Sequence, residues 1–259
     1  MKKKICLILT IIFIATMTGC SLQNNDIEPK TKEEVKVTSS IELDDTTPSG
    51  NYKVEGVAFF SYERPETITY GQLDSLGRPT YATANITAEL YAKEKNEKRE
   101  PIKVNPVGWP ETNPRVQVKH KDGTSYKGYF WNRSHMIADS LGGEPIVENL
   151  ITGTRAQNVG TRRNDGGMAY AETKVRKHFD SGNKSAVWYE VINFYNDNEL
   201  IPRRTLVNMK SDDGSIDERV VVYNTTDGYK IDYNTAEITD NNKSEWFKLA
   251  DSDERKIHT

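Results

Sequence analysis

Short segments in which apolar and polar residues alternate recur between residues 57 and 233, and a period of two is typical of half-buried β-strands. The predicted strands span residues 57–62, 115–119, 125–131, 187–195, 206–210, 219–223 and 229–233. Between the second and third of them lies Asp122-Gly123, a pair that supplies the positive φ of a tight turn. We therefore expect a hairpin over residues 115–131 within an antiparallel sheet.

A helical period replaces this alternation from Gly167 to Phe179, where Met168 and Val175 share the apolar stripe with Phe179 and Gly182 can end the helix. A shorter helix is predicted to begin at Thr83, a suitable N-cap residue, and to run through residue 92. Prolines at 101, 106, 110 and 114 predict an irregular, extended connection. The chain is therefore predicted to be an α+β protein with a central antiparallel β-sheet and one principal helix.

Residues 1–19 have the features of a secretory signal peptide. Three lysines precede an apolar run from Ile5 to Met17, and Thr-Gly precedes Cys20. A cysteine in this position resembles a bacterial lipobox, in which Cys20 would carry a lipid. Met17 is an uncommon residue three positions before such a cysteine, so cleavage by ordinary signal peptidase is the alternative. We expect a protein outside the cytoplasm, anchored to the membrane through Cys20 or secreted.

The remaining chain divides by composition. Residues 20–52 are polar and contain little that could bury apolar surface, which predicts a flexible tether. Residues 53–240 are predicted to fold as one domain, and residues 241–259 form a polar tail. Cys6 would leave with the signal and Cys20 would carry the lipid, so we expect neither a disulfide nor a thiolate metal site.

The charge of the whole chain gives no sign of nucleic-acid binding, because the formal net charge is −3. Attraction to an anionic substrate would therefore need a local cationic surface. Residues 153–178 contain six cations against two anions. The cations are Arg155, Arg162, Arg163, Lys174, Arg176 and Lys177. A solvated helix face is the alternative explanation for this local excess.

His135 is the candidate general base, because an imidazole titrates near neutral pH. It follows the predicted strand 125–131 and precedes an apolar, glycine-containing segment, 136–143. The other histidines fall in a turn, near a helix end and in the tail: His120, His178 and His258. A single loop histidine is more often structural than catalytic, so its candidate partners carry the argument.

Asn158 and Glu172 are those partners. A neutral amide oxygen is a weak ligand, so a cation held by Asn158 would keep several waters, as Mg²⁺ prefers to do. A turn residue beside Gly160 is the alternative for Asn158. Glu172 falls on the apolar stripe of the principal helix, where a carboxylate needs a charged partner or a metal. An i,i+4 pair with Arg176 explains Glu172 equally well.

A base, a cation site and a carboxylate together suit the metal-assisted cleavage of a phosphodiester, which needs an activated water and neutralisation of the phosphate charge. Arg133 lies two residues before His135 and would point to the same side of an extended strand. It is a candidate phosphate clamp, and an ordinary surface arginine is the alternative.

These segments resemble the DNA/RNA non-specific endonuclease family, the ββα-metal (His-Me finger) nucleases, and most closely its streptodornase-like and DNA-entry-nuclease branch in Gram-positive bacteria. The resemblance extends from about residue 56 to residue 238. It rests on Asn132-Arg133-Ser134-His135, on Ser140-Leu141-Gly142-Gly143, on residues 149–158 (NLITGTRAQN) and on residues 169–177 (AYAETKVRK).

The resemblance implies that His135 is the general base and that Asn158 is the single protein ligand of a hydrated Mg²⁺, for which Mn²⁺ can substitute. It also implies that Glu172 orients water on the ion and that Arg133 stabilises charge on the phosphate. The usual tetrapeptide of the family is Asp-Arg-Gly-His, so Asn132 and Ser134 depart from it and put the loop geometry in question. Arg155, Arg162, Arg163 and Arg176 are kept as candidate substrate contacts.

The sequence thus predicts a secreted or membrane-tethered, Mg²⁺-dependent endonuclease that cuts DNA without sequence preference and leaves 5′-phosphate ends. RNA is left open as a second substrate. A surface lipoprotein that binds nucleic acid or another polyanion without cutting it is the main alternative. A solute-binding lipoprotein is a third class, but such proteins need two α/β lobes, which this strand-rich order does not supply.

Overall fold

The computed structural model of the protein describes residues 48–161 and 165–241. The predicted signal peptide, most of the predicted tether, Arg162 and Arg163, and the tail beyond residue 241 lie outside the described residues. Within the described residues, no helix has the length and apolar character needed to cross a membrane. Asn51 is buried and its amide donates to the carbonyl oxygens of Tyr223 (3.2 Å) and Thr225 (2.9 Å), so the folded unit already includes the last residues of the predicted tether.

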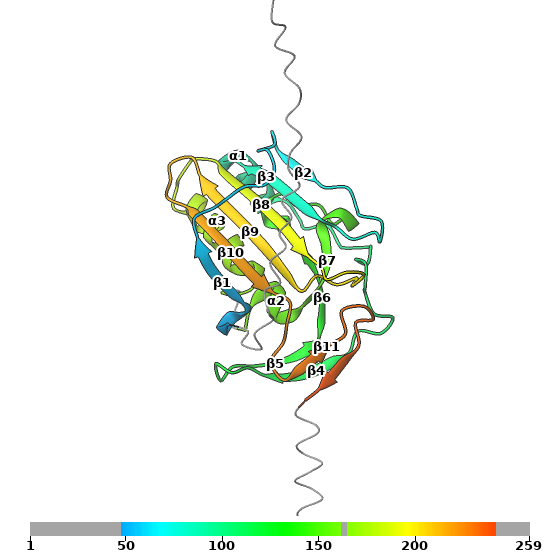
Figure 1. Ribbon diagram of the computed structural model, residues 1–259. Helices are drawn as coiled ribbons and strands as arrows, with labels where there is room; N and C mark the ends of the chain where they lie inside the picture. The colour runs from blue at the N-terminus through cyan, green and yellow to red at the C-terminus, as the bar shows by residue number, and fades with distance from the viewer. Residues whose placement is uncertain (1–47, 162–164, 242–259) are drawn as a thin grey trace, which may run out of the picture. The chain divides into compact units, whose positions relative to one another are not determined.

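A six-stranded antiparallel sheet in the order β1-β10-β9-β8-β3-β2 forms the centre of the fold (Figure 1). Its strands are β1 (Tyr52–Gly56), β2 (Ile68–Tyr70), β3 (Tyr81–Ile86), β8 (Val187–Phe194), β9 (Arg204–Ser211) and β10 (Asp217–Tyr223). The strands predicted at 187–195, 206–210 and 219–223 are confirmed as β8, β9 and β10. The α+β class with a central antiparallel sheet is confirmed as well.

The helices α1 (Ala88–Asn96) and α3 (Met168–Asp180) lie on one face of this sheet (Figure 1). The main hydrophobic core fills the space between them, where Met168, Val175 and Phe179 of α3 meet residues of β3, β8, β9 and β10. The predicted principal helix is therefore confirmed, with the apolar stripe that its sequence indicated. Gly182 follows it with a φ of 90°.

The segment 57–62 is not a strand, and this prediction is wrong. It crosses the other face of the sheet, where its backbone N–H groups donate to side chains instead of to a neighbouring strand. Ala58 N donates to Asp217 Oδ1 at 2.8 Å, and Tyr62 N donates to the buried Glu190 Oε2 at 2.8 Å. The ring of Phe60 stacks on Trp188 at a centroid distance of 3.7 Å. These contacts cover the outer face of β8 and β9.

The short helix does not begin at Thr83 as predicted. Residues 81–86 continue as β3, because Ala82, Ala84 and Ile86 alternate into the core. Thr87 is the actual N-cap, and its hydroxyl accepts a hydrogen bond from Leu90 N at 3.2 Å. Both threonines satisfy the local rule for a cap, so only the burial of β3 distinguishes them.

Residues 125–131 divide between two ribbons, so the single predicted strand is wrong at its end. β4 (Arg115–Lys119) pairs with β5 (Ser125–Tyr129), and β6 (Trp131–His135) pairs with β7 (Leu150–Thr154). Phe130 separates the two ribbons and donates its N–H to Pro114 O at 2.9 Å. β7 was not predicted. The connection over residues 101–114 contains no helix or strand, as its prolines indicated.

A second, smaller core joins both ribbons to the hairpin of β11 (Tyr229–Ile231) and β12 (Ile238–Asp240). Phe130, Trp131, Ile201, Tyr233 and Ala236 are its buried members. The inward face of β4 packs on this core through Val116. The position of both ribbons is therefore fixed by apolar packing at the end of the sheet that lies below in Figure 1.

Candidate active site

The candidate site is built on the β6–β7 ribbon and on α2 (Arg155–Val159), which follows β7 directly. Thr154 caps α2, since its hydroxyl accepts a hydrogen bond from Gln157 N at 2.9 Å. The helix folds back over β6, so that Asn158 Oδ1 accepts a hydrogen bond from Ser134 Oγ at 3.2 Å. This turn of the chain brings Asn158 beside the strand that ends at His135.

The loop between His135 and β7 is fixed by Asn149, which is fully buried. Its Oδ1 accepts from Ile137 N at 2.8 Å, and its Nδ2 donates to the carbonyl oxygens of Ile137 and Glu144, both at 2.9 Å. The loop is tight, because a Cβ at Gly143 would lie 1.7 Å from Ile137 O. Asn149 therefore orients the backbone next to His135, and its hydrogen-bond partners among the described residues are all backbone groups.

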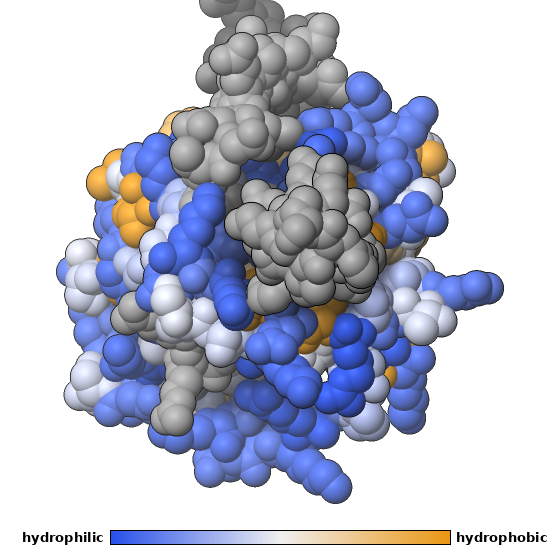
Figure 2. Space-filling view, turned by 90° about the horizontal axis from the view of Figure 1, so that it is seen from below, coloured by the Kyte–Doolittle hydropathy of each residue, from blue (hydrophilic) through white to orange (hydrophobic). Residues whose placement is uncertain are grey.

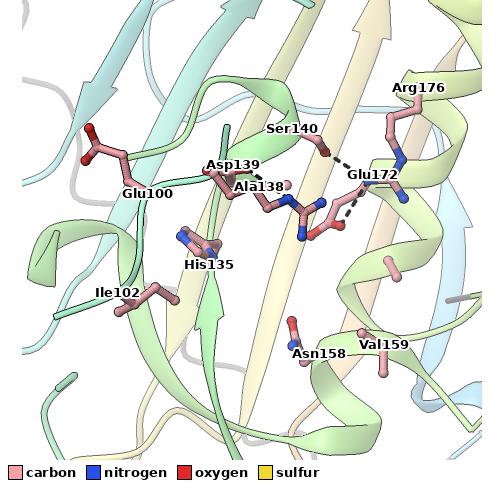
Figure 3. Close-up of a pocket in the computed structure, with 12 residues that line it drawn as sticks. Glu100, Ile102, His135, Ala138, Asp139, Ser140, Asn158, Val159, Glu172 and Arg176 are labelled. Atoms are coloured by element: carbon pink, nitrogen blue, oxygen red, sulfur yellow. Dashed lines mark hydrogen bonds and ion pairs between the residues drawn. The ribbon is translucent and has the colours of Figure 1, made fainter. Parts of the chain in front are cut away.

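One cavity of about 440 Å³ brings together His135, Asn158 and Glu172. Figure 3 shows the imidazole and the carboxamide facing this space from β6 and α2, while Glu172 and Arg176 reach it from α3. The cavity thus unites the three predicted groups although they come from three separate elements. Arg99, Asp139 and Ser140 complete much of its polar lining.

His135 is held as a neutral base. Burial, and to a smaller extent the nearby Arg99 guanidinium, together lower the pKa of its imidazole from 6.5 to about 4. The Nε2 atom is buried and has no hydrogen-bond partner among the described residues. An unpaired buried nitrogen is costly unless a ligand or water uses it, so this lone pair is available to accept a proton.

The i,i+4 ion pair that the sequence allowed for Glu172 is present, and the same carboxylate also faces the cavity. Its side chain is 13% exposed and lies 3.4 Å from Arg176 Nη1, in the i,i+4 relation, and it also lines the cavity. Burial raises the pKa of the Glu172 carboxyl, and the guanidinium groups of Arg176 and Arg99 oppose that rise. Arg176 is fixed in turn by Ser140 Oγ (3.1 Å) and Thr173 Oγ1 (2.7 Å).

The groups in this cavity suit a hard cation that keeps most of its water. The described residues hold no cluster of three or more His, Cys, Asp and Glu side chains that could bind a metal by themselves. Asn158 Oδ1 and the Glu172 carboxylate offer oxygen ligands, and the room between them can hold water. Mg²⁺ prefers this combination of few protein oxygens and several waters, so the residues fit the predicted ion.

Two of the predicted arginines do not line the cavity. Arg133 donates to Asn105 Oδ1 from Nε (2.9 Å) and Nη2 (2.6 Å), and its guanidinium lies 4.7 Å from the centre of the Trp109 ring. Arg155 instead lies over the ring of Tyr126 at 5.5 Å. Their predicted roles toward phosphate remain predictions.

Comparison with known proteins identifies the family. The model of the DNA/RNA non-specific endonuclease family matches residues 60–213, which is more than half of the chain. The chain belongs to the DNA/RNA non-specific endonuclease family. This confirms the resemblance drawn from the sequence motifs, and every cavity-lining residue named above lies inside the matched region.

Individual relatives agree with this family assignment. A curated deoxyribonuclease from Streptococcus dysgalactiae subsp. equisimilis is 36% identical over 194 residues, which make up 64% of this chain and 58% of that protein. The structure of Sda1 nuclease with bound zinc ion is 32% identical with a TM-score of 0.67, covering 73% of this chain and 96% of that one. NucA from Streptococcus agalactiae with magnesium ion bound is 24% identical with a TM-score of 0.56 and covers 74% of this chain and 91% of that one. The last likeness concerns the fold alone.

Arg99 also lines the cavity, and the sequence did not single it out. It lies in the charge-dense segment after α1, lines the cavity, and contacts Asp139 Oδ2 through Nε at 3.2 Å. Its side chain is 77% exposed, so it can approach an anion. Nothing distinguishes it in sequence from the six other charged residues of 93–100, and only the fold selects it.

Proposed function

We propose that the protein is a metal-dependent endonuclease that hydrolyses phosphodiester bonds of DNA. The observation that carries the proposal is the unpaired Nε2 of a buried, neutral His135 in the same cavity as Asn158 and Glu172. Family membership supports the same reaction. The chain spans 58% of the curated deoxyribonuclease, so that enzyme's activity is taken here as an analogy.

His135 accepts a proton from the attacking water. Its imidazole is neutral at physiological pH because burial disfavours the cation, and no donor within residues 48–161 and 165–241 engages its Nε2 atom. A base of this kind contributes on the order of 10²–10⁴-fold to the rate. The loop fixed by Asn149 holds the imidazole in place, which reduces the entropy lost when water and phosphate come together.

Asn158 and Glu172 hold the ion: the carboxamide oxygen would be the direct ligand, and the carboxylate would accept hydrogen bonds from the waters that remain. When bound, Mg²⁺ supplies positive charge against the phosphate and the departing 3′-oxygen. Glu172 is kept in this position by Arg176, and Arg176 is kept by Ser140 and Thr173.

Arg99 is the cation placed best to contact the substrate phosphate from the protein side. It is exposed and has one carboxylate contact, whereas the Arg176 guanidinium has three partners and Arg133 is held against Asn105 and Trp109. A guanidinium can hold two phosphate oxygens at once. The main role that we assign to Arg176 is to position Glu172, and substrate binding is a secondary role.

The products are expected to carry 5′-phosphate ends, because the 3′-oxygen leaves. RNA is a second candidate substrate, since the family description covers both DNA and RNA. The proposed place of action is outside the cell, either on the membrane through a lipid on Cys20 or in free form; the signal-like residues 1–19 support both.

Digestion of plasmid DNA with Mg²⁺, with EDTA, and with EDTA followed by excess Mg²⁺ tests the proposal. We expect the plasmid to be cut with Mg²⁺, to stay intact with EDTA, and to be cut again when excess Mg²⁺ follows EDTA. The ends should be accepted directly by a ligase that requires 5′-phosphates. Unchanged cutting in EDTA would exclude the metal. Binding of DNA without cutting under every condition would support the polyanion-binding lipoprotein that the sequence left as the alternative.

A further inference from the structure

Tyr189 of β8 is buried with its hydroxyl unpaired. The residue is 0% exposed, and the hydroxyl has no hydrogen-bond partner among residues 48–161 and 165–241. Seen from the ribbon end of the molecule, the surface outside the grey atoms is mostly hydrophilic, so polar groups there can bind solvent (Figure 2). The Tyr189 hydroxyl has no such access. A buried hydroxyl without a partner is costly, and a phenylalanine at this position would avoid that cost.

The other buried tyrosines of the described chain do not share this feature. The Tyr91 hydroxyl donates to Asp180 Oδ1 at 2.8 Å, and the Tyr233 hydroxyl donates to Asn224 O at 2.8 Å. Buried polar groups are paired as a rule, and exceptions are concentrated at functional sites. The surroundings of the Tyr189 hydroxyl therefore bear on the function of the protein.

The Tyr189 ring belongs to the main core, on the face of β8 that is turned toward α3. Its cross-strand neighbours are Ala84 of β3 and Met209 of β9. All three are fully buried, in the same core cluster as Met168 and Val175 of α3. The hydroxyl thus lies in the interior between the sheet and the helix that carries Glu172.

Glu172 approaches the same region from α3. It lies four residues after Met168 and three before Val175, so it shares the inward side of the helix with these two core residues. Burial raises the pKa of the Tyr189 phenol well above its ordinary value of 10, the charge of Glu172 raises it further, and Arg176 opposes the rise. Both charged groups are therefore near enough to act on the hydroxyl, and the phenol stays protonated.

The Glu172 carboxylate can accept a further hydrogen bond. Among the described residues, Arg176 is the only donor to it, and the contact of 3.4 Å is longer than the usual distance of about 2.9 Å. An ionised carboxylate only accepts hydrogen bonds, whereas a protonated phenol can donate one. One internal water is enough to join two polar groups that do not touch each other.

We infer that Tyr189 is a positioning residue for Glu172: from the core side its hydroxyl donates, through one internal water, to the carboxylate and holds it in place for the ion. The inference rests on the proposed function, in which Glu172 accepts hydrogen bonds from the waters on Mg²⁺. It accounts for a tyrosine at a position where phenylalanine would suit the core better. Stability lost at one residue in favour of a site is a common trade in enzymes.

Tyr189→Phe removes the hydroxyl and keeps the ring. Binding of Mg²⁺ to the full chain without DNA is measured by calorimetric titration, and the thermal midpoint is measured without metal. Loss of a group that supports a metal-binding side chain weakens metal affinity by about 10–100-fold, so we expect the Kd for Mg²⁺ to rise by about tenfold or more. The midpoint should stay the same or rise, because an unpaired buried hydroxyl has been removed.

Tyr91→Phe is the matched control, because it makes the same change in the same core at a hydroxyl that has a partner, Asp180. It should lower the thermal midpoint and leave the Mg²⁺ affinity unchanged. A second comparison uses Glu172→Ala protein. Tyr189→Phe should cause little further loss of Mg²⁺ affinity there, because the hydroxyl acts through the carboxylate that has been removed.

An unchanged Mg²⁺ affinity in Tyr189→Phe, or a loss that is just as large in Glu172→Ala protein, would overturn the positioning role. A midpoint lowered as much as in Tyr91→Phe would overturn it too, because the hydroxyl would then make a structural hydrogen bond. Each of these results leaves the proposed function standing as long as the wild-type protein binds Mg²⁺ and cuts DNA. A wild-type protein that does neither would instead overturn the proposed function itself.

Discussion

The protonation state of His135 is set by where its side chain lies. The imidazole is largely buried at the end of β6, and the nearest cation that acts on it is Arg99. Both influences disfavour the charged ring, so a neutral base is available without a carboxylate partner. The same burial leaves Nε2 without a donor or acceptor in the part of the chain that the structure describes. The side chain is therefore ready to take a proton from a water molecule.

The pH dependence of kcat/KM should show this shift. The active form is the deprotonated imidazole, and its pKa is lowered from 6.5 to about 4, so activity should persist as the pH falls through 6.5. It should be lost at lower pH, where protonation of the Glu172 carboxyl, whose pKa burial raises, adds to that of His135. Arg99→Gln removes one of the two causes and should move this acidic limb to higher pH. A limb at or above 6.5 in the wild-type protein would contradict the assignment of His135 as the buried base.

Ser134 stands where the family usually has glycine, and it orients Asn158. Its hydroxyl donates to Asn158 Oδ1 at 3.2 Å, the oxygen proposed to hold the ion. Ser134→Ala should raise the Mg²⁺ concentration needed for half-maximal activity by roughly tenfold, as is usual when a partner of a metal ligand is lost. The rate at saturating Mg²⁺ should change little. An unchanged Mg²⁺ requirement would show that the hydroxyl has no part in metal binding.

At the level of elements, the close approach of α2 and α3 aligns Asn158 with Glu172. Gly167 precedes α3 with a φ of 55°, and a Cβ there would lie 2.1 Å from Gln157 O in α2. Only glycine allows this approach, because any side chain would both strain the backbone and push the helices apart. The distance between Asn158, the proposed metal ligand, and the Glu172 carboxylate is therefore fixed by backbone packing.

Gly167→Ala should destabilise the fold by on the order of 2 kcal/mol or more and reduce activity further than the loss of folded protein explains. Gly182→Ala is the matched control, because Gly182 also has a positive φ, 90°, but open space around its Cβ position. Gly182→Ala should lower the free energy of unfolding only by the strain of placing an alanine at a positive φ. Urea unfolding gives the free energy of unfolding of each variant, and an assay at saturating Mg²⁺ gives its activity. Equal losses in the two variants would refute the claim that the packing of α2 on α3 aligns Asn158 with Glu172.

The elements that the sequence predicted well are those that pair with a neighbouring strand or pack on the core along their whole length. α3 shows one helical period, and β8 to β10 each direct alternate apolar residues into the main core. The segment 57–62 has the same alternation, but its N–H groups are satisfied by Asp217, Asn208 and Glu190 from distant strands. Local periodicity cannot show such partners. β7 was missed for the opposite reason: all five of its residues are buried, so it has no alternation to detect.

At the scale of the whole molecule, β1 closes one edge of the sheet. It pairs with β10 through Tyr52, Lys53 and Val54, and the Tyr52 ring stacks on Tyr170 of α3 at 4.1 Å. A protein of residues 48–241 should keep the thermal midpoint of the full chain. A protein of residues 57–241 loses β1 and should melt about 5 °C lower or more, at roughly 2–4 °C per kcal/mol for a domain of this size. Calorimetry of both decides this, and equal midpoints would show that β1 is dispensable.

The candidate site could be predicted in part because its chemistry depends on rare residue types at motif spacing. His135, Asn158 and Glu172 were found in this way and meet in one cavity. Arg99 was missed, because one arginine in a charge-dense turn has no sequence signal until the fold places it beside His135. The placing of Arg133 on Trp109 was likewise not predictable, since it depends on the irregular path of residues 101–114.

The most direct measurement of the central claim is the single-turnover cleavage rate of His135→Ala at saturating Mg²⁺, together with its DNA affinity in EDTA. The account predicts a rate lower by about 10²–10⁴-fold, with DNA affinity and thermal midpoint close to those of the wild-type protein. Cleavage within a few-fold of the wild-type rate would contradict it, because the proton of the attacking water would then be taken by another group.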